Sequence, residues 1–279
     1  MITSGIDIGS LSTKALILEE GAIRSSRVIF TGPDSIESAT QVMKLALQDA
    51  SITMDQIQYT IATGYGRVNV PFAQGTITEI SCHARGNHHF FPQVRTILDM
   101  GGQDCKAIRC DQNGRLTNFS MNDKCAAGTG RYLERAAATL GLELNQIGPL
   151  SLQLMEGPLT ISNTCAVFAE MDIIRLMREG KHTNDIIAGA ADAIVGRVIA
   201  LLERVGIEEA LCVSGGVAKN IGVLKMLEER LGLKVHIAAE PQIMGALGAS
   251  LFAMVRGRLE NLRVEEWTGS EGVLHGEHV

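Results

Sequence analysis

The sequence predicts an α/β protein made of two similar domains, and an internal repeat is the main reason. Residues 6–16 (IDIGSLSTKAL) and residues 98–108 (LDMGGQDCKAI) align without a gap at an offset of 92 residues. Each copy is typical of an apolar strand, a glycine turn and a second strand, and each leads into another turn, a strand and helices. Thirty glycines, against seven Phe, three Tyr and one Trp in 279 residues, agree with a fold of many tight turns. Strands and helices mixed in this way indicate the α/β class.

Apolar periodicity and turn signals predict the order of the elements. In a first domain, residues 1–94, the strand triplet is followed by a helix over 35–50, a short strand near 59–62 and a helix near 78–89. In a second domain, residues 95–249, a strand triplet starting near 94 precedes helices from about 126, 165 and 183, a strand at 210–213, a helix at 217–231, a strand near 234–237 and a helix at 243–256. We expect a C-terminal helix over 250–267 to return to the first domain, and residues 268–279 to form a tail.

Composition and charge exclude several classes of protein. The net charge of −6 argues against a surface that tracks nucleic-acid phosphates. Asp7 interrupts the N-terminal apolar stretch, so this stretch resembles neither a signal peptide nor a membrane span. Six cysteines without a secretory signal indicate reduced thiols rather than a disulfide framework. We therefore expect a cytoplasmic protein that binds neither nucleic acid nor a membrane.

Two cysteines stand where the sequence begins a helix. Cys125 follows the residues NDK and Cys165 follows SNT, and each leads into helical apolar spacing that ends at a glycine, Gly141 or Gly180. Unpaired N–H groups and the positive end of the helix dipole favour a thiolate at such a position, and any anionic centre built on it.

The number of these cysteines suggests how they are used. An iron–sulfur cluster needs four thiolates. This pair supplies two from one copy of the chain, and two copies together supply four. This arithmetic suggests a homodimer with one cluster on its two-fold axis. The alternative is that both thiols act as small apolar residues, as free cysteines usually do, and their spacing alone leaves that alternative open.

The glycine turns of the repeat indicate a bound polyphosphate. A turn without Cβ atoms lets backbone N–H groups approach an anion closely, and one such turn from each domain across a cleft grips it from both sides. A third turn, SGGVAKN at residues 214–220, follows a short strand and opens a helix, as a nucleoside-binding loop does. There is no GxxxxGK[ST] motif, and the GTG of residues 128–130 lacks the last glycine of GxGxxG.

These segments carry a resemblance to a known family. GIDIGSLSTK, LDMGGQDCK and SGGVAKN resemble the two phosphate motifs and the adenosine motif of the superfamily that contains actin, hexokinase, the acetate and sugar kinases and the heat-shock chaperone ATPases. GYGR, TEISCHARG, NDKCAAGTGRYLE, NTCAVFAE and PQIMGALGA are similar to the activators, or component A, of 2-hydroxyacyl-CoA dehydratases and to the ATPase subunits of benzoyl-CoA reductases. The resemblance spans nearly the whole chain. It implies duplicated ribonuclease H-like domains of the actin and hexokinase type, with a nucleotide cleft between them.

The resemblance also implies a function. The family is a dimeric ATPase with one [4Fe-4S] cluster between its subunits, and Cys125 and Cys165 fall on the cysteines that hold it. A reduced ferredoxin or flavodoxin loads the cluster, and ATP hydrolysis with Mg²⁺ drives one low-potential electron onto a partner iron–sulfur dehydratase or reductase. Such an uphill transfer requires that hydrolysis be coupled to a conformational change.

The two phosphate turns supply the expected catalytic residues. Gln103 and Asp104 are placed to orient the attacking water beside the γ-phosphate, and Asp7 to hold Mg²⁺ through water. Asp99 occupies the position of Asp7 in the second copy of the repeat. It either holds Mg²⁺ through water in the same way or caps the turn, and the two interpretations are equally favoured. Lys14 is expected to donate to phosphate, with the alternative that it is an exposed residue of its strand. The expected nucleotide-binding residues are Gly9, Ser10, Ser12, Thr13, Lys14, Gly101, Gly102, Gly128, Thr129, Gly130, Glu134, Gly215, Gly216, Val217, Asn220 and Gly245.

The other cysteines and histidines have simpler interpretations. Cys105 stands after GGQD, where the family more often has Thr or Ser, and we expect it in the core. We expect the same of Cys82, Cys110 and Cys212. Cys82 and His83 have no second pair at ligand spacing, which disfavours a metal site. His88 and His89 are expected to face solvent at a helix end.

Three other functions stay open at this point. A small-molecule kinase of the same superfamily would tolerate Ala at both Cys125 and Cys165, although the chain shows no obvious inserted substrate-binding subdomain. An actin-like filament or scaffold protein would sediment in a nucleotide-dependent way and contain no iron. The third is a reductive activator of a different iron–sulfur partner, such as a double-cubane protein.

Overall fold

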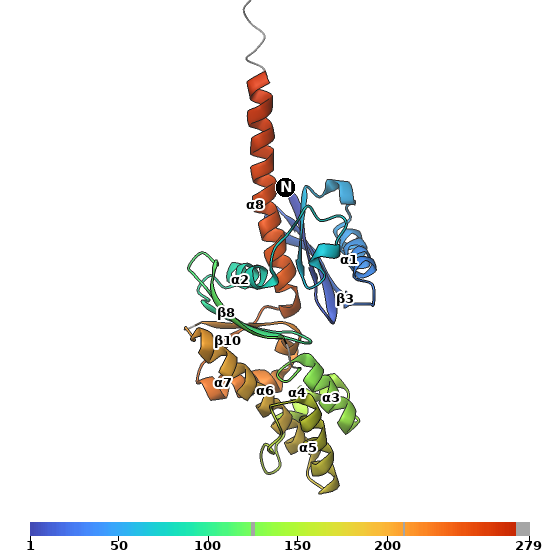
Figure 1. Cartoon of the computed structure of the whole chain (residues 1–279), viewed down its shortest axis with the longest axis vertical. Helices are drawn as coiled ribbons and strands as arrows, with labels where there is room; N and C mark the ends of the chain where they lie inside the picture. Colours follow the sequence, from blue (N-terminus) through green and yellow to red (C-terminus); the bar gives the residue numbers. More distant parts are fainter. Residues whose placement is uncertain (124–125, 209, 272–279) are drawn as a thin grey trace, which may run out of the picture. The chain divides into compact units, whose positions relative to one another are not determined.

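The structure of the chain is a computed structural model that describes residues 1–123, 126–208 and 210–271, with side chains up to residue 260. These residues group into two compact units. Unit 1 contains Met1–Gly9, Thr13–Cys82 and the chain from Gly245 onward, and unit 2 contains Ser10–Ser12 and His83–Met244. Figure 1 follows the chain through both units from blue to red.

Unit 1 is built on a five-stranded mixed sheet of order β3-β2-β1-β4-β5. Its strands are β1 (Ile2–Ile8), β2 (Ser12–Glu19), β3 (Ala22–Phe30), β4 (Tyr59–Gly64) and β5 (Gly75–Thr76), with short 3₁₀ turns η1 (Met54–Gln56) and η2 (Arg67–Asn69). The side chain of Asp34 caps α1 (Ser35–Ala50), and Val42 and Ala46 of this helix pack on Ile6 and Ile17 of the sheet. Burial of this apolar face fixes the helix on the sheet.

The C-terminal helix, α8 (Met244–Glu271), packs on β1 of unit 1. A Cβ atom on Gly5 would lie 2.0 Å from the Ala246 carbonyl oxygen, so strand and helix meet backbone to backbone. Thr3 Oγ1 donates a hydrogen bond of 3.3 Å to the Ser250 carbonyl. The expected tail begins at Thr268 inside α8, and residues 272–279 lie outside the described residues.

Unit 2 is built on a second five-stranded mixed sheet, of order β10-β9-β6-β7-β8. Its strands are β6 (Thr96–Met100), β7 (Cys105–Cys110), β8 (Leu116–Asn122), β9 (Leu211–Ser214) and β10 (Val235–His236). Its helices are α3 (Gly130–Leu140), α4 (Leu144–Ser151), α5 (Ala166–Arg178), α6 (Thr183–Val205) and α7 (Ile221–Leu231), with 3₁₀ turns η3 (Gly216–Lys219) and η4 (Pro241–Ile243). α2 (Glu79–Phe90) runs from unit 1 into unit 2.

The helices α3 to α7 gather on one side of the second sheet (Figure 1). α6 is the longest of them, and its Ile187, Ile194 and Leu202 are fully buried in the core of the unit. A helix that is apolar on most of its surface must be covered by other elements, which is why α6 lies within the helical layer.

The two sheets repeat one another in topology. In each, the first two strands form an antiparallel hairpin, and the first strand also pairs in parallel with a later one. The hairpin registers match, because Asp7 lies opposite Lys14 and Asp99 lies opposite Lys106. The predicted α/β fold with a duplicated hairpin is confirmed.

Three helices differ from their predictions. α7 begins at Ile221, four residues later than expected, because residues 216–219 form the 3₁₀ turn η3. α3 begins at Gly130, four residues later than expected, because residues 126–129 form the turn that leads into it. α4 was not expected, since Gly148 and Pro149 interrupt its helical pattern, yet a capping box of Glu143 and Gln146 begins it. No helix in the described ranges is long and apolar enough to cross a membrane.

The prediction for His88 is wrong. Its side chain is buried, whereas that of His89 is exposed as expected. The reason is the turn after β7, which packs on the imidazole: a Cβ atom on Gly114 would lie 2.7 Å from the Cδ2 atom of His88. Burial lowers the pKa of His88.

Candidate functional site

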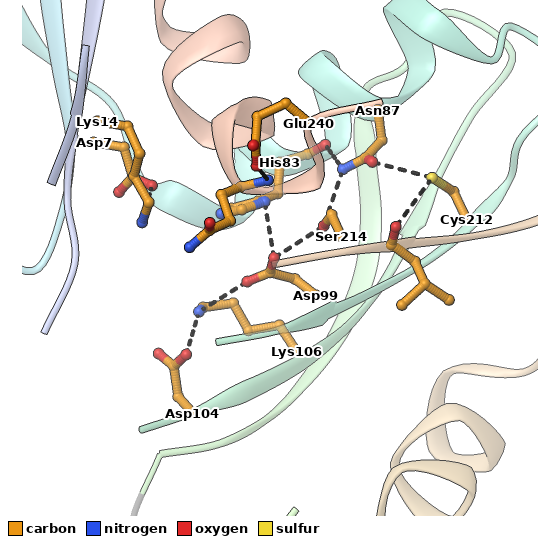
Figure 2. A network of polar contacts seen from close by, with 12 residues as sticks. Asp7, Lys14, His83, Asn87, Asp99, Asp104, Lys106, Cys212, Ser214 and Glu240 are labelled. Atoms are coloured by element: carbon orange, nitrogen blue, oxygen red, sulfur yellow. Dashed lines mark hydrogen bonds and ion pairs between the residues drawn. The ribbon is translucent and has the colours of Figure 1, made fainter. Parts of the chain in front are cut away.

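In unit 2, two carboxylates of the repeated hairpin surround one buried lysine. Asp99 lies near the end of β6, Lys106 lies opposite it on β7, and Asp104 lies in the turn between them. Lys106 Nζ is 2.8 Å from Asp104 Oδ1 and 3.5 Å from Asp99 Oδ2. Figure 2 draws both contacts as dashed lines. Burial alone disfavours a charged lysine, so the two carboxylates are what stabilise the ammonium group here.

The Asp104 carboxylate is held by the turn as well as by the lysine. The Gly101 N–H donates a hydrogen bond of 2.9 Å to the Asp104 carbonyl, which closes the turn. A Cβ atom on Gly101 would lie 2.6 Å from Asp104 Oδ1, so the carboxylate lies directly over this glycine. Its neighbour Gln103 is exposed. The hairpin thus places a fixed carboxylate and an exposed amide side by side.

Asp99 is held by residues from two other elements, and these residues were not predicted. Ser214 Oγ, at the end of β9, donates a hydrogen bond of 2.9 Å to Asp99 Oδ1, and Asn87 Nδ2 of α2 lies 3.4 Å from the same Ser214 oxygen (Figure 2). His83 Nδ1, also on α2, is 3.3 Å from Asp99 Oδ1 but has no hydrogen-bond partner. The only sequence signals for them were the SGGVAKN and TEISCHARG segments that contain Ser214 and His83.

Unit 1 repeats the lysine–aspartate pair in a simpler form. Lys14 Nζ lies 3.1 Å from Asp7 Oδ2, and Asp7 is buried. Gly64, at the end of β4, has φ +85°, and a Cβ atom there would lie 2.6 Å from Asp7 Oδ1. The residue that corresponds to Asp104 at the offset of 92 is Ser12, so this hairpin brings one carboxylate to its lysine rather than two.

The third glycine turn follows β9 as predicted. Gly215 has φ +87°, and a Cβ atom on it would lie 2.3 Å from the Met100 carbonyl oxygen, so only glycine fits against β6. Gly216 begins η3, in which Val217 is buried. The Asn220 side chain caps α7, accepting two N–H bonds of 3.1 and 3.0 Å.

α3 begins directly on the phosphate turn of unit 2. The Gly130 N–H donates to the Gly101 carbonyl at 3.0 Å, and the Arg131 N–H donates to the Gly102 carbonyl at 2.9 Å. Carbonyl groups of the turn therefore satisfy the first N–H groups of the helix. Turn and helix form one hydrogen-bonded piece, reached from β8 through Gly128, which has φ +93°.

The other predicted nucleotide residues lie on or near these turns. Thr129 is the buried N-cap residue of α3, and Glu134 pairs with Arg131 at 2.9 Å on the same helix. In unit 1, Gly245 is buried in the first turn of α8, and Thr13 is buried in β2. Of the predicted residues in the first phosphate turn, Ser10 is exposed, and Gly9 and Ser12 are half-buried.

The two predicted cluster cysteines differ in what the structure describes. Cys125 lies outside the described residues. Cys165 is a free, half-buried thiol and is itself the N-cap residue of α5, where its side chain makes no capping bond. A free and partly accessible thiol at an uncapped helix start has the donor chemistry that an iron–sulfur cluster takes.

The remaining four cysteines are buried in the core, as predicted. Burial raises the pKa of Cys82 and of Cys212 to about 12, and it raises the pKa of Cys105 and of Cys110 as well. Cys105 Sγ donates to the Gly128 carbonyl at 2.8 Å. Ligation requires a thiolate, which these sites disfavour. Within the described ranges, no three His, Cys, Asp or Glu side chains gather as a metal-binding group.

Buried aspartates at two matched glycine turns, with a third turn after a parallel strand, define a nucleotide-binding α/β protein. The chain belongs to the BadF/BadG/BcrA/BcrD ATPase family, whose sequence pattern matches residues 4–253. The family predicted from the motifs is therefore confirmed. Membership of this family identifies the chain as an ATPase.

Relatives and solved structures agree with this assignment. Over 254 residues the chain is 43% identical to the activator of lactoyl-CoA dehydratase from Anaerotignum propionicum, covering 91% of this chain and 97% of that protein. Component A of (R)-2-hydroxyglutaryl-CoA dehydratase from Acidaminococcus fermentans superposes with a TM-score of 0.89 at 39% identity, covering 92% of this chain and 99% of that one. The activator of 2-hydroxyisocaproyl-CoA dehydratase from Clostridium difficile, with bound ADPNP, also gives 0.89, at 37% identity over 94% and 98% of the two chains.

Proposed function

We propose that this chain is a homodimeric iron–sulfur ATPase that couples ATP hydrolysis to the transfer of one low-potential electron onto a partner, a 2-hydroxyacyl-CoA dehydratase or a related reductase. The observation that carries the proposal is the bond between phosphate turn and helix: the Gly101 and Gly102 carbonyls hold the first N–H groups of α3, five residues after Cys125. Membership of an ATPase family and the likeness to dehydratase activators support the reaction.

Nucleotide binding rests on the three glycine turns. Residues 9–14 and 101–104 offer N–H groups, hydroxyls and Lys14 to the phosphates, and residues 215–220 receive the nucleoside, with Gly128, Thr129, Gly130, Glu134 and Gly245 completing the proposed set. The ADPNP bound by the Clostridium difficile activator supports ATP as the ligand.

Hydrolysis requires that a water be oriented and that phosphate charge be neutralised. Asp104, fixed over Gly101, accepts a hydrogen bond from the attacking water, and the exposed Gln103 amide reaches the same water. Asp7 and Asp99 are carboxylates of the kind that hold Mg²⁺ through water, although each is already paired with a lysine. When bound, Mg²⁺ neutralises charge on the phosphates.

Cys125 and Cys165 from each of two copies would hold one [4Fe-4S] cluster. Among the described cysteines, Cys165 alone is not buried, so it fits a ligand role better than the other four. When bound, the cluster supplies one-electron redox chemistry. The N–H groups at the start of α5 favour negative charge at Cys165.

α5 offers a surface for protein partners beside this cysteine. It carries five exposed apolar side chains, from 37% to 62% exposed: Val167, Phe168, Met171, Ile174 and Met177. Exposed apolar side chains that recur along one helix indicate an interface. The proposed contacts of the protein are a second copy of the chain, the acceptor dehydratase or reductase, and a ferredoxin or flavodoxin donor, all in the cytoplasm where thiols stay reduced.

Iron content and oligomeric state test the proposal. Protein purified without oxygen is expected to contain about four irons per dimer, because four thiolates hold one cluster. Cys125→Ser and Cys165→Ser are each expected to lose the iron and ATP-dependent electron transfer, while both still bind ATP. Cys110→Ala is the matched control, since it removes a buried thiol and should keep the iron.

Two results would contradict the proposal. Four irons in a strictly monomeric protein would exclude a cluster shared between copies. Full iron content in both cysteine variants would exclude them as ligands, and phosphorylation of a small molecule by those variants would favour a kinase instead.

A further inference from the structure

We propose that Lys106 is a positioning residue for ATP hydrolysis, acting through Asp104: its ammonium group holds the Asp104 carboxylate over Gly101 and is itself anchored by Asp99. This inference rests on the proposed role of Asp104 in hydrolysis. It assigns to Lys106 a role of its own, distinct from binding phosphate.

The contacts of Lys106 link the Asp104 carboxylate to the strands of the sheet. Its Nζ lies 2.8 Å from Asp104 Oδ1 on one side and 3.5 Å from Asp99 Oδ2 on the other. Asp99 is fixed in turn by the Ser214 hydroxyl at 2.9 Å. Lys106 lies on β7 with a side chain only 5% exposed, so its stem cannot move without the sheet. The position of the Asp104 carboxylate is thus set by three strands rather than by the turn alone.

The internal repeat shows that the Asp104–Lys106–Asp99 bridge, a lysine between two carboxylates, is specific to the second hairpin. Both hairpins place a lysine opposite an aspartate, with Nζ to carboxylate distances of 3.1 Å in unit 1 and 3.5 Å in unit 2. Unit 2 adds Asp104 where unit 1 has Ser12. The added carboxylate takes the shorter of the two Lys106 contacts, at 2.8 Å. The bridge therefore depends on Asp104, which is present in the second turn and has no carboxylate counterpart in the first.

Loss of the ammonium group has a definite consequence for Asp104. Two buried carboxylates would remain on one hairpin without the cation between them, and like charges in a buried site do not both stay ionised in place. Without the ammonium group, repulsion from Asp99 moves the Asp104 carboxylate away from its place over Gly101, and this movement removes an oriented acceptor for water. Phosphate contacts of the glycine turns do not depend on this carboxylate, so binding of ATP should persist.

A double-mutant cycle tests the inference. Steady-state ATP hydrolysis is measured for the wild type, Lys106→Met, Asp104→Asn and the double variant, with unfolding temperature and iron content for each. Lys106→Met is expected to lower kcat by roughly 10²-fold, as misplacement of an orienting group does, with KM changed by less than about threefold. In the Asp104→Asn background the same substitution should cost nothing further. Lys234→Met, which breaks the exposed pair with Glu228, is the control and should hydrolyse ATP like the wild type.

Each outcome decides the matter. Wild-type kcat in folded Lys106→Met, or losses that multiply in the double variant, would overturn the role of Lys106. Wild-type kcat in Asp104→Asn would overturn both this role and that of Asp104. If Lys106→Met does not fold, the cycle is run with Lys106→Gln, which keeps a donor but not the charge, and the same non-additivity is expected. Unchanged iron content separates this result from a failure of the electron-transfer proposal.

Discussion

The five described cysteines show how the fold divides one residue type into two chemical classes. Cys82 and Cys212 lie in the cores beside aspartates, and burial raises the pKa of each thiol to about 12. Cys165 ends a loop at the start of α5 and is half-buried. A thiolate is the form that reacts and binds metal, so the raised pKa of the buried thiols disfavours them, and Cys165 is the described cysteine with access to solvent.

Thiol labelling of iron-free, reduced protein checks this division. At pH 8 a thiol with a pKa near 12 is ionised to about one part in ten thousand, so the buried cysteines should react slowly with iodoacetamide. Cys165 is expected to react at least about tenfold faster than Cys82, Cys110 or Cys212, as measured by peptide mass spectrometry.

The pH dependence of labelling has a definite sign. Because burial raises the pKa of the core thiols, their labelling should rise steadily as the pH increases from 8 toward 12. Protein unfolded in urea is the control, in which every cysteine should react at a similar rate. Rapid labelling of Cys212 in folded protein at pH 8 would show that the core is open.

At the scale of elements, the structure joins the phosphate turn to α3. The carbonyls of Gly101 and Gly102 accept the N–H bonds of Gly130 and Arg131, and Cys105 Sγ reaches the Gly128 carbonyl. The turn and the helix start therefore move as one piece or break three hydrogen bonds. A nucleotide that shifts the turn has a short path to the segment that contains Cys125.

Iron chelation measures whether this path couples nucleotide to cluster. In the wild type, a slowly hydrolysed ATP analogue should change the rate of iron loss to a chelator by at least about fivefold relative to ADP, which is a typical coupling. Gly128→Ala should abolish the nucleotide effect while leaving most of the iron, because φ +93° disfavours any side chain in the loop that leads into α3.

The same helix supplies a matched control. Gly141 ends α3 with φ +68° and has open space around it, so Gly141→Ala imposes the same kind of strain at the far end of the helix. This variant should retain the nucleotide effect. Equal chelation rates in every nucleotide state of the wild type would mean that α3 does not couple hydrolysis to the cluster.

At the scale of the whole molecule, the two duplicated α/β units bury four of the five described cysteines and leave Cys165 half-buried. The four buried cysteines and the ion pairs of the hairpins belong to the two units themselves. The proposed cluster uses Cys165, which is not buried in the core of either unit. Its loss should therefore leave the fold of each unit intact.

Exposure to air separates these two parts of the molecule. Air is expected to bleach the brown absorbance of the purified dimer within the time of an assay, because a cluster at an interface is open to solvent and oxidant. Circular dichroism and ATP binding should stay unchanged. The iron-free Cys165→Ser variant, with and without air, is the control for effects on the protein itself. A cluster that survives prolonged aeration during turnover would contradict a shared, exposed site.

The sequence by itself determined the features that depend on neighbours along the chain. The hairpins at 6–16 and 98–108 could be predicted because strand alternation and a glycine turn are local, and the offset of 92 residues made the duplication visible. The family followed from the same segments. The roles assigned to Asp104, Gln103, Asp7 and the nucleotide residues remain predictions.

Only the tertiary structure decided which distant residues support the hairpin. Ser214 reaches Asp99 from 115 positions along the chain, and His83 comes to the same carboxylate from α2. In the sequence, Lys106 is marked only as the counterpart of Lys14 at the offset of 92 residues, whereas the fold places it between two buried carboxylates. His88 was expected in solvent and is buried under the Gly114 turn. Periodicity and capping report on contacts within an element, but burial and charge pairing depend on which elements the folded chain brings together, and no local pattern encodes that choice.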